Sequence, residues 1–253
     1  TARSGAFREF LSPYINEGIV APWQIDIEKE NVFVGAPAMN AICKSLASGL
    51  NVRTGAQVQD LTRGPQGWIL DIDSAQAGPF DLVVSSAPAP QTSILFEDYF
   101  AYQNALAAIQ YQPCFALMLG FSAAKALDWK ALRPRTGGIG WIGINASKPG
   151  RDNTQTTITI HTKAKWTQDH LEENADDLLE TIRDMAQAFL PFDLAAANFA
   201  AAHKWRYANV HKPLSAPGGA PYLYDAESGL AAIGDWCQSG RVEAAFESAN
   251  ALA

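Results

Sequence analysis

The stretch AAIGDWCQSGRVEAAFESA, residues 231–249, holds an aspartate and an arginine between two different sequence patterns. The apolar run 230–233 predicts a short buried strand, and apolar residues at i, i+3, i+4 and i+7 after Gly240 predict a helix. Those residues are Val242, Ala245, Phe246 and Ala249. Asp235 then lies at the carboxyl end of a strand, where open α/β sheets bind ligands, and its carboxylate can accept a hydrogen bond from a ligand hydroxyl.

Arg241 stands at the unfavourable end of the predicted helix. Its charge opposes the helix dipole by about a few tenths of a kcal/mol, whereas the free N–H groups of a helix N-terminus favour an electron-rich atom. One interpretation is that an anionic partner lies near Arg241. The other is that Arg241 extends into solvent and Asp235 is an ordinary turn residue. These residues alone leave both interpretations open.

A second glycine pattern, GIGWIG at residues 138–143, matches the dinucleotide-binding spacing GxGxxG. That motif needs a helix that opens within it, so that the helix N-terminus meets a pyrophosphate. Here Pro149 and Gly150 follow closely and would break such a helix. The pattern therefore predicts a glycine-rich strand of a central sheet.

The elements at the two ends of the chain resemble α/β structure. Residues 22–35 predict a hairpin around the polar turn 28–31, and residues 35–50 predict a helix. The run FDLVVSSAPAP, residues 80–90, is apolar without alternation, which is typical of a strand buried on both faces. We expect it beside the strand 230–233 in one sheet.

The middle of the chain has a different organisation. Residues 115–120, 157–161 and 203–210 are rich in β-branched and aromatic residues and predict a separate, mostly antiparallel sheet. In TTITIHT, Ile158 and Ile160 alternate with polar residues, which predicts a sheet with one polar face. His161 lies on that face and is expected to be exposed. One amphipathic helix, 171–189, interrupts these strands.

Composition excludes several classes of function. The 253 residues carry a net charge of −7, with no basic stripe, so nucleic acid is not an expected partner. No apolar run approaches the roughly 18 residues of a membrane span, so no membrane partner is expected either. Cys43, Cys114 and Cys237 are odd in number and far apart, which favours a reducing cytoplasm. The four histidines include no HExxH or HxH pair, so no metal site is expected.

The C-terminal residues GDWCQSGRVEAAFESA resemble the closing FAD motif of the flavin amine oxidase superfamily. TAR at the start and HKWRYANV at 203–210 narrow the resemblance to its renalase-like branch, over nearly the whole chain. The resemblance implies that Asp235, after Gly234, binds the ribityl or pyrophosphate part of FAD. It also implies that the helix N-terminus faces the flavin pyrimidine edge and that the backbone of Val58, in VRTGAQVQDL, contacts the adenine. At the N-terminus of that helix, the residues implied to face the flavin are Arg241, Val242 and Glu243.

The resemblance also implies a fold, an α/β plus α+β chain. A partial FAD-binding, Rossmann-like domain of the glutathione reductase type would hold an inserted substrate domain with a mainly antiparallel β-sheet. Residues 1–34 and 99–217 would form the substrate domain, and residues 35–98 and 218–253 the FAD-binding domain. Family members begin with a strand, a GxGxxG turn and a helix, and no such unit occurs in the 253 residues. We therefore expect an N-terminally truncated form that lacks FAD and is inactive by itself.

The implied reaction is hydride transfer from a dihydronicotinamide-type substrate, an isomeric NAD(P)H, to FAD and then to O2, giving H2O2. A dihydropyridine becomes aromatic when it loses hydride, so no strong base is needed and the cofactor performs the difficult step. His203, Trp205 and Tyr207 share one face of a predicted strand and are the candidate catalytic residues, although an aromatic stripe also suits a core. Two alternatives remain: an oxidase of the same superfamily acting on an amine, and a non-catalytic fragment without FAD.

Overall fold

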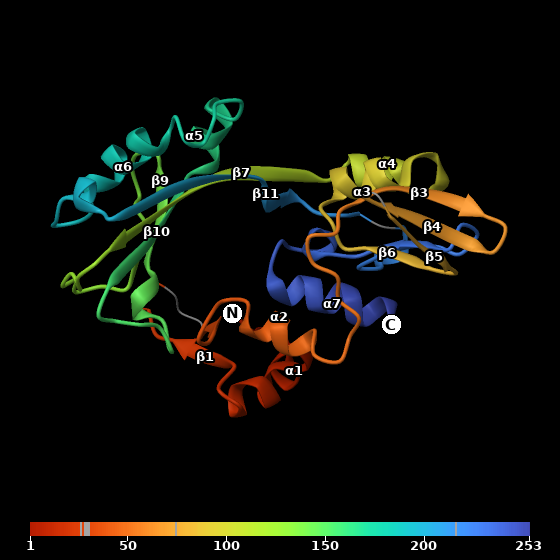
Figure 1. Cartoon of the computed structure of the whole chain (residues 1–253), viewed down its shortest axis with the longest axis horizontal. Helices are drawn as coiled ribbons and strands as arrows, with labels where there is room; N and C mark the ends of the chain where they lie inside the picture. Colours follow the sequence, from red (N-terminus) through yellow and green to blue (C-terminus); the bar gives the residue numbers. More distant parts are fainter. Residues whose placement is uncertain (26, 28–30, 74, 216) are drawn as a thin grey trace. The chain divides into compact units, whose positions relative to one another are not determined.

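The computed structural model describes residues 1–25, 27, 31–73, 75–215 and 217–253. The chain divides into two compact units, Thr1–Ser48 with Gln112–Asn209, and Gly49–Tyr111 with Val210–Ala253 (Figure 1). These boundaries differ from the expected 34/35, 98/99 and 217/218. Residues 35–48 belong to the unit that contains the hairpin, and the two longest strands, β7 and β11, each cross a boundary. Which unit binds which ligand stays a proposal.

The first unit contains a hairpin and a five-stranded sheet in the order β11-β7-β10-β9-β8. The pairs β7–β10, β10–β9 and β9–β8 are antiparallel, as is the hairpin β1–β2. Its elements are α1 (Gly5–Asn16), β1 (Val20–Trp23), β2 (Val32–Gly35), α2 (Ala41–Leu46), β7 (Gln110–Phe121), β8 (Ala131–Leu132), β9 (Ile139–Ile144), β10 (Thr156–Thr162), α5 (Ala164–Asp169), α6 (Leu179–Gln187) and β11 (Phe199–Lys212), with 3₁₀ turns η2 (Asn145–Ser147) and η3 (Leu194–Ala196).

The core of the first unit lies between one face of this sheet and α6 (Figure 1). Along β10 the side chains alternate between buried and half-buried, as a strand with one covered face requires. Ile158 and Ile160 face the core, where they meet Leu117 and Leu119 of β7 and Ile182 of α6. The alternation predicted for TTITIHT is therefore confirmed.

The second unit contains two three-stranded sheets, β12-β13-β6 and β3-β4-β5. β13 pairs in parallel with β6, with Leu230 opposite Val83 and Ala232 opposite Ser85, whereas β12 is antiparallel to β13. The elements are β3 (Val58–Gly64), β4 (Gly67–Ile72), β5 (Ala75–Phe80), β6 (Val83–Ser85), α3 (Ala89–Phe96), α4 (Gln103–Ala107), β12 (Leu223–Asp225), β13 (Leu230–Ala232) and α7 (Val242–Leu252), with 3₁₀ turns η1 (Glu97–Tyr99), η4 (Pro217–Gly219) and η5 (Asp235–Cys237).

Two tryptophans anchor the core of the second unit. Trp68 and Trp236 are each 1% exposed and lie in one cluster with Phe96 and Leu230. Both indole N–H groups find backbone acceptors. Trp68 donates to the carbonyl of Ser228 at 2.8 Å, and Trp236 donates to that of Ala87 at 3.1 Å. Burial of these rings is therefore achieved without an unpaired donor.

Several predictions from the sequence are confirmed. Strand 230–232 pairs with 83–85, and the strands of the middle segment form a separate sheet. The glycine pattern 138–143 lies in and beside β9, so it opens no helix. The hairpin is present as β1 and β2, and residues 28–30 of its predicted turn lie outside the described residues.

Two predicted helices are shorter in the structure. The helix expected over 35–50 is reduced to α2, because Pro37 disfavours helical backbone at the residue before it and Gly49 takes a left-handed conformation with φ of 83°. The helix expected over 171–189 begins only at Leu179. Upstream of it, the carbonyls of Leu171 and Glu173 accept hydrogen bonds from Lys204 Nζ at 2.8 and 3.0 Å.

Candidate functional site

The C-terminal segment of the second unit forms the strand, turn and helix that the sequence predicts. β13 ends at Ala232, the 3₁₀ turn η5 begins at Asp235, and α7 begins at Val242. Gly234 joins strand to turn with φ of 156°. A Cβ at Gly234 would lie 2.5 Å from Trp236 Nε1, closer than real contacts allow. The turn therefore needs glycine at this position for space as well as for conformation.

Hydrogen bonds hold this turn in one shape. The carbonyl of Asp235 accepts the N–H groups of Gln238, Ser239 and Gly240 at 3.2, 3.2 and 3.0 Å. The N–H of Gly234 donates to the buried hydroxyl of Ser248 on α7 at 3.1 Å. These internal bonds hold the backbone that carries Asp235 in one conformation.

The end of β6 is joined to the same turn. Ile233 donates its N–H to the carbonyl of Ser85 at 3.0 Å, one residue beyond the parallel ladder. The Ser85 and Thr92 hydroxyls lie 2.7 Å apart, and the Thr92 hydroxyl donates to the carbonyl of Ala87 at 3.1 Å. The carboxyl ends of both parallel strands therefore meet at one edge, which is where open α/β sheets bind ligands.

Asp235 is a partly buried carboxylate that follows the end of β13. Its side chain is half-buried, and burial raises its pKa, while the backbone N–H of Trp236 partly opposes that rise. The neighbouring Cys237 is different. Burial raises the pKa of its thiol to about 11, so the thiol stays protonated at neutral pH and is not a nucleophile. Asp235 is the group at this turn that can accept a hydrogen bond from a ligand hydroxyl.

Arg241 is the N-cap of α7, directly before the first helical residue, Val242. Its backbone is extended, with φ of −127°, and its side chain caps none of the helix N–H groups. Its Nε atom is buried and has no hydrogen-bond partner within the described part of the chain. The Nε atom is therefore shielded from water, which favours the interpretation that an acceptor lies near Arg241. A buried donor of this kind needs an acceptor.

Val242 and Glu243, the first two residues of α7, differ in their exposure to solvent. Val242 is 77% exposed, whereas Glu243 is 2% exposed and buried in the first turn. The α7 N-terminus therefore offers backbone N–H groups beside an open apolar side chain. An acceptor that approaches this end meets the helix dipole and Arg241 together.

Val58 lies at a cavity of about 760 Å³ within the second unit. The cavity is also lined by Ser85, Ser86, Ala87 and Gln91, from the end of β6 and the start of α3. Two of these lining residues also bind the C-terminal segment, since Ser85 accepts the N–H of Ile233 and Ala87 accepts the indole N–H of Trp236. The cavity is large enough for a cofactor-sized group, since ligand pockets are typically about 300–1,000 Å³.

The three candidate catalytic residues belong to the first unit. The rings of His203 and Trp205 on β11 are 4.5 Å apart in an edge-to-face arrangement, and both side chains are exposed. Tyr207 is half-buried. Because His203 and Trp205 are exposed, these two rings do not form part of the hydrophobic core of the first unit.

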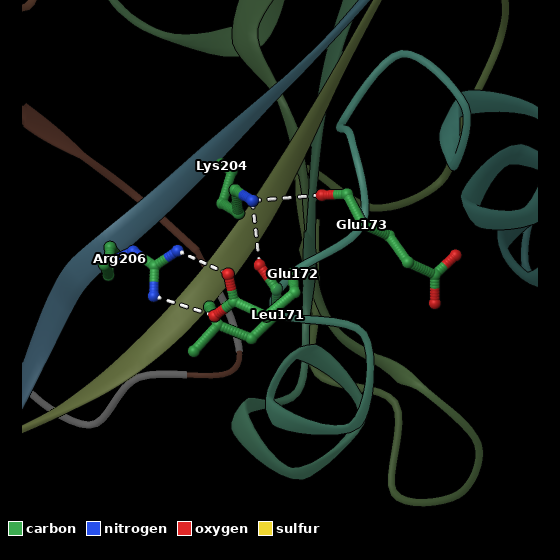
Figure 2. Close-up of polar contacts among 5 residues, drawn as sticks. All are labelled: Leu171, Glu172, Glu173, Lys204 and Arg206. Atoms are coloured by element: carbon green, nitrogen blue, oxygen red, sulfur yellow. Dashed lines mark hydrogen bonds and ion pairs between the residues drawn. The ribbon is translucent and has the colours of Figure 1, made fainter.

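Lys204 and Arg206 point the other way from β11, toward the segment that precedes α6 (Figure 2). Arg206 donates to both carboxylate oxygens of Glu172, at 3.1 and 3.3 Å, and Lys204 donates to two backbone carbonyls. The predicted division of the strand into two faces is therefore visible. These contacts join Lys204 and Arg206 of β11 to the segment 171–173, whereas His203 and Trp205 on the same strand are exposed.

The described residues contain no group of three or more His, Cys, Asp or Glu side chains that could hold a metal ion. No helix among them is both long and apolar enough to cross a bilayer.

A family model described as flavin containing amine oxidoreductase matches residues 5–253. The chain belongs to this family. The strand–turn–helix with Asp235 and the antiparallel sheet of the first unit are thus parts of a fold shared by FAD-dependent oxidoreductases, and the predicted fold class is confirmed.

Solved structures of this fold are distant in sequence. A proposed protoporphyrinogen oxidase from Exiguobacterium sp. 255-15 matches with 14% identity and a TM-score of 0.64, over 87% of this chain and 51% of that one. An oxidoreductase from Methanosarcina mazei matches with 16% identity and a TM-score of 0.58, over 88% and 55%. Cyclohexylamine oxidase from Brevibacterium oxydans IH-35A matches with 11% identity and a TM-score of 0.55, over 76% and 46%. The chain spans about half the length of the structures that it matches.

Sequence reasoning missed part of the site. The hydroxyl pair Ser85–Thr92 organises the edge beside Asp235, yet only the run VVSSAPAP pointed toward it. His161 was expected to be exposed, but it is half-buried, and burial and the charge of Lys148 lower its pKa. For the Ser85–Thr92 pair, the available signal was the group of small and hydroxyl residues that follows the apolar strand.

We predict that Gly234→Ala distorts the turn and lowers the free energy of unfolding by about 1–3 kcal/mol, because the new Cβ would collide with the Trp236 indole in a conformation unsuited to alanine. Gly5→Ala is the matched control, since a Cβ at Gly5 has open space within 4 Å and Gly5 begins α1. Denaturant unfolding followed by tryptophan fluorescence measures both. Equal stability of the two variants would contradict the steric requirement at Gly234.

Proposed function

We propose that this chain is part of an FAD-dependent oxidase that takes a hydride from a dihydronicotinamide-type substrate, an isomeric NAD(P)H. The substrate loses two electrons and one proton as hydride and becomes NAD(P)+. O2 accepts the two electrons and, with that proton and one from solvent, becomes H2O2. The observation that carries the proposal is the buried Arg241 Nε, without a described partner, at an N-terminus that no side chain caps.

The residues of the turn suit the polar parts of FAD. Asp235 is half-buried and can accept a hydrogen bond from a ribityl hydroxyl. Arg241, Val242 and Glu243 form the helix N-terminus, whose N–H groups and positive charge favour the edge of a ring that gains negative charge on reduction. Val58 lines the neighbouring cavity and is proposed to contact the adenine through its backbone. FAD would supply the hydride acceptor, and the protein residues would orient it.

The proposed substrate residues are His203, Trp205 and Tyr207. Trp205 is 56% exposed and stands edge-to-face with His203, so an aromatic ring is available for contact with a planar ligand. No base has to remove a proton from carbon in this reaction, because aromatisation of the pyridine ring drives the loss of hydride. A sequence without a catalytic triad or a paired-carboxylate motif is compatible with that chemistry.

The activity is proposed for the protein that contains these residues, since the chain spans about half of its structural relatives. We also propose that residues 1–253 alone hold FAD weakly and are inactive. The GxGxxG spacing at 138–143 lies in and beside β9 and opens no helix, and a GxGxxG turn that opens a helix supplies N–H groups to a pyrophosphate. A reducing cytoplasmic location is proposed on the free thiols, of which Cys43 is exposed.

A second candidate is an oxidase of the same family that acts on an amine. Family membership and the fold shared with a cyclohexylamine oxidase favour it. The two candidates use the same FAD site and differ in the molecule that donates the hydride. Measurements on the complete protein with both substrate classes separate them.

We predict that Asp235→Ala in the complete protein weakens FAD binding by about 10- to 150-fold, because a charged hydrogen bond contributes about 1.5–3 kcal/mol. FAD titration followed by flavin fluorescence measures the Kd, with the unmodified 253-residue chain as the weak-binding reference. Asp71→Ala, on β4, is a control that removes a carboxylate which accepts from Gln76 Nε2. An Asp235→Ala protein that folds and binds FAD as tightly as the wild type would show that Asp235 is only a turn residue.

Arg241→Gln should lower the reduction potential of bound FAD, because the guanidinium stabilises negative charge on the reduced ring more than the neutral oxidised ring. A loss of about 1–3 kcal/mol corresponds to roughly 20–60 mV for a two-electron couple. Potentiometry with reference dyes measures it. Arg8→Gln removes an exposed guanidinium that binds backbone carbonyls and should leave the potential unchanged. The same potential in Arg241→Gln and wild type would refute the role of Arg241.

Anaerobic mixing of the complete, FAD-loaded protein with isomeric NADPH should bleach the visible flavin absorbance, and air should restore it with release of H2O2. Putrescine and cyclohexylamine serve as the amine arm. Bleaching by the amines alone would replace the first candidate with the second. FAD-loaded protein that reacts with neither class would contradict both.

A further inference from the structure

The five-stranded sheet of the first unit has a second face, opposite α6, that carries polar side chains. Thr157, Thr159 and His161 alternate with the core residues of β10 and are half-buried. His161 pairs across the sheet with Ala116 of β7 and Trp141 of β9. The side chains of this polar face are partly shielded from solvent, and none of them belongs to the site at Asp235.

Lys148 lies directly after η2 and is held over this face. Its Nζ donates to Asn145 Oδ1 at 3.1 Å, and Asn145 Nδ2 donates to Thr157 Oγ1 at 3.3 Å. The ammonium also lies 5.3 Å from the centroid of the Trp23 ring, whose Nε1 donates to Ser147 Oγ at 3.1 Å. The lysine is therefore half-buried in a defined place and is not a freely moving surface cation.

Arg151 adds a second positive charge near Lys148. Its guanidinium donates to the backbone carbonyls of Gly35 at 3.1 Å and of Pro149 at 3.4 Å. Burial and the charge of Arg151 lower the pKa of Lys148, and burial and the charge of Lys148 lower the pKa of His161. Among the described residues, no carboxylate hydrogen-bonds or ion-pairs with these three side chains.

Half-buried cations without a carboxylate are costly, because desolvation penalises each charge and the like charges repel one another. Backbone carbonyls and one amide oxygen offset only part of that cost. An oxyanion would compensate the charges, and Thr157 and Thr159 offer additional hydroxyl donors on the same face. The arrangement is thus matched to a negatively charged group.

We propose that Lys148, Arg151 and His161 form a subsite that binds an oxyanion of the substrate, a carboxylate or a phosphate. The proposal rests on the proposed function only for the identity of the molecule that carries the oxyanion. The subsite binds and orients, and no bond is made or broken there. Its charge attracts a phosphate-bearing dihydropyridine and repels an ammonium group, so it favours the first of the two candidate substrate classes.

The first experiment compares two hydride donors with the same reactive ring, reduced nicotinamide mononucleotide and reduced nicotinamide riboside, which differ by one phosphate. In the complete FAD-loaded protein, Lys148→Gln should raise the apparent Kd for the mononucleotide by about 10- to 100-fold and leave that for the riboside within about twofold. Anaerobic stopped-flow measurement of flavin reduction gives both values.

Two further variants separate binding from folding. Lys148→Arg keeps the charge and should restore most of the affinity for the mononucleotide. Lys165→Gln removes one charge from a side chain that is 89% exposed and paired with Asp169 at 3.5 Å, and it should change neither substrate. Equal losses for mononucleotide and riboside in Lys148→Gln would overturn the subsite, because they would assign Lys148 a general structural role.

A second measurement does not depend on the redox reaction. Nicotinate and nicotinamide differ by a carboxylate in place of an amide, and their binding to the complete protein is measured by calorimetry. Nicotinate should bind more tightly, and Lys148→Gln should abolish that preference. If no dihydropyridine reduces the flavin but the nicotinate preference depends on Lys148, the proposed function fails and the anion subsite stands. If the dihydropyridines react and neither anion preference depends on Lys148, the subsite fails and the function stands.

Discussion

Parallel pairing of β6 with β13 determines where the candidate site of the second unit lies. The two strands are separated by more than a hundred residues, yet Ser85 lies opposite Ala232 and both strands end at the same edge. The bonds from Ile233 to Ser85 and from Trp236 to Ala87 continue the connection beyond the ladder. Asp235 and the α7 N-terminus follow from this pairing, because the turn has no freedom to place them elsewhere.

Partial burial of charge is a property that the two candidate sites share. Asp235 and Lys148 are both half-buried, and in both the surroundings oppose the charged form. Exposed pairs such as Arg206 with Glu172 contribute little to stability, since water screens them. A charge that a fold keeps away from water at a cost is a candidate for binding a specific partner, whereas an exposed pair is largely screened by water.

Local patterns predicted the strands and the turn but not the ends of the helices. The run before Asp235 and the alternation in TTITIHT depend on neighbouring residues, so the sequence is sufficient for them. The helix before Phe189 was predicted too long because Lys204, distant in sequence, takes the carbonyls of Leu171 and Glu173. The burial of Arg241 Nε and the proximity of Lys148 to His161 also depend on contacts that no periodicity encodes. Tertiary contacts override local preference at these positions.

The place of β6 in its sheet affects how the protein behaves at high concentration. Among the described strands, β6 ends the order β12-β13-β6, and one edge of its ladder has no strand beside it. Leu82 just before it and Val84 within it are 48% and 42% exposed. An apolar edge strand of this kind is a template for strands of other molecules. Its length of three residues limits how many backbone hydrogen bonds such a pairing could form, and this contact between molecules is a separate matter from the resistance of the cores to unfolding.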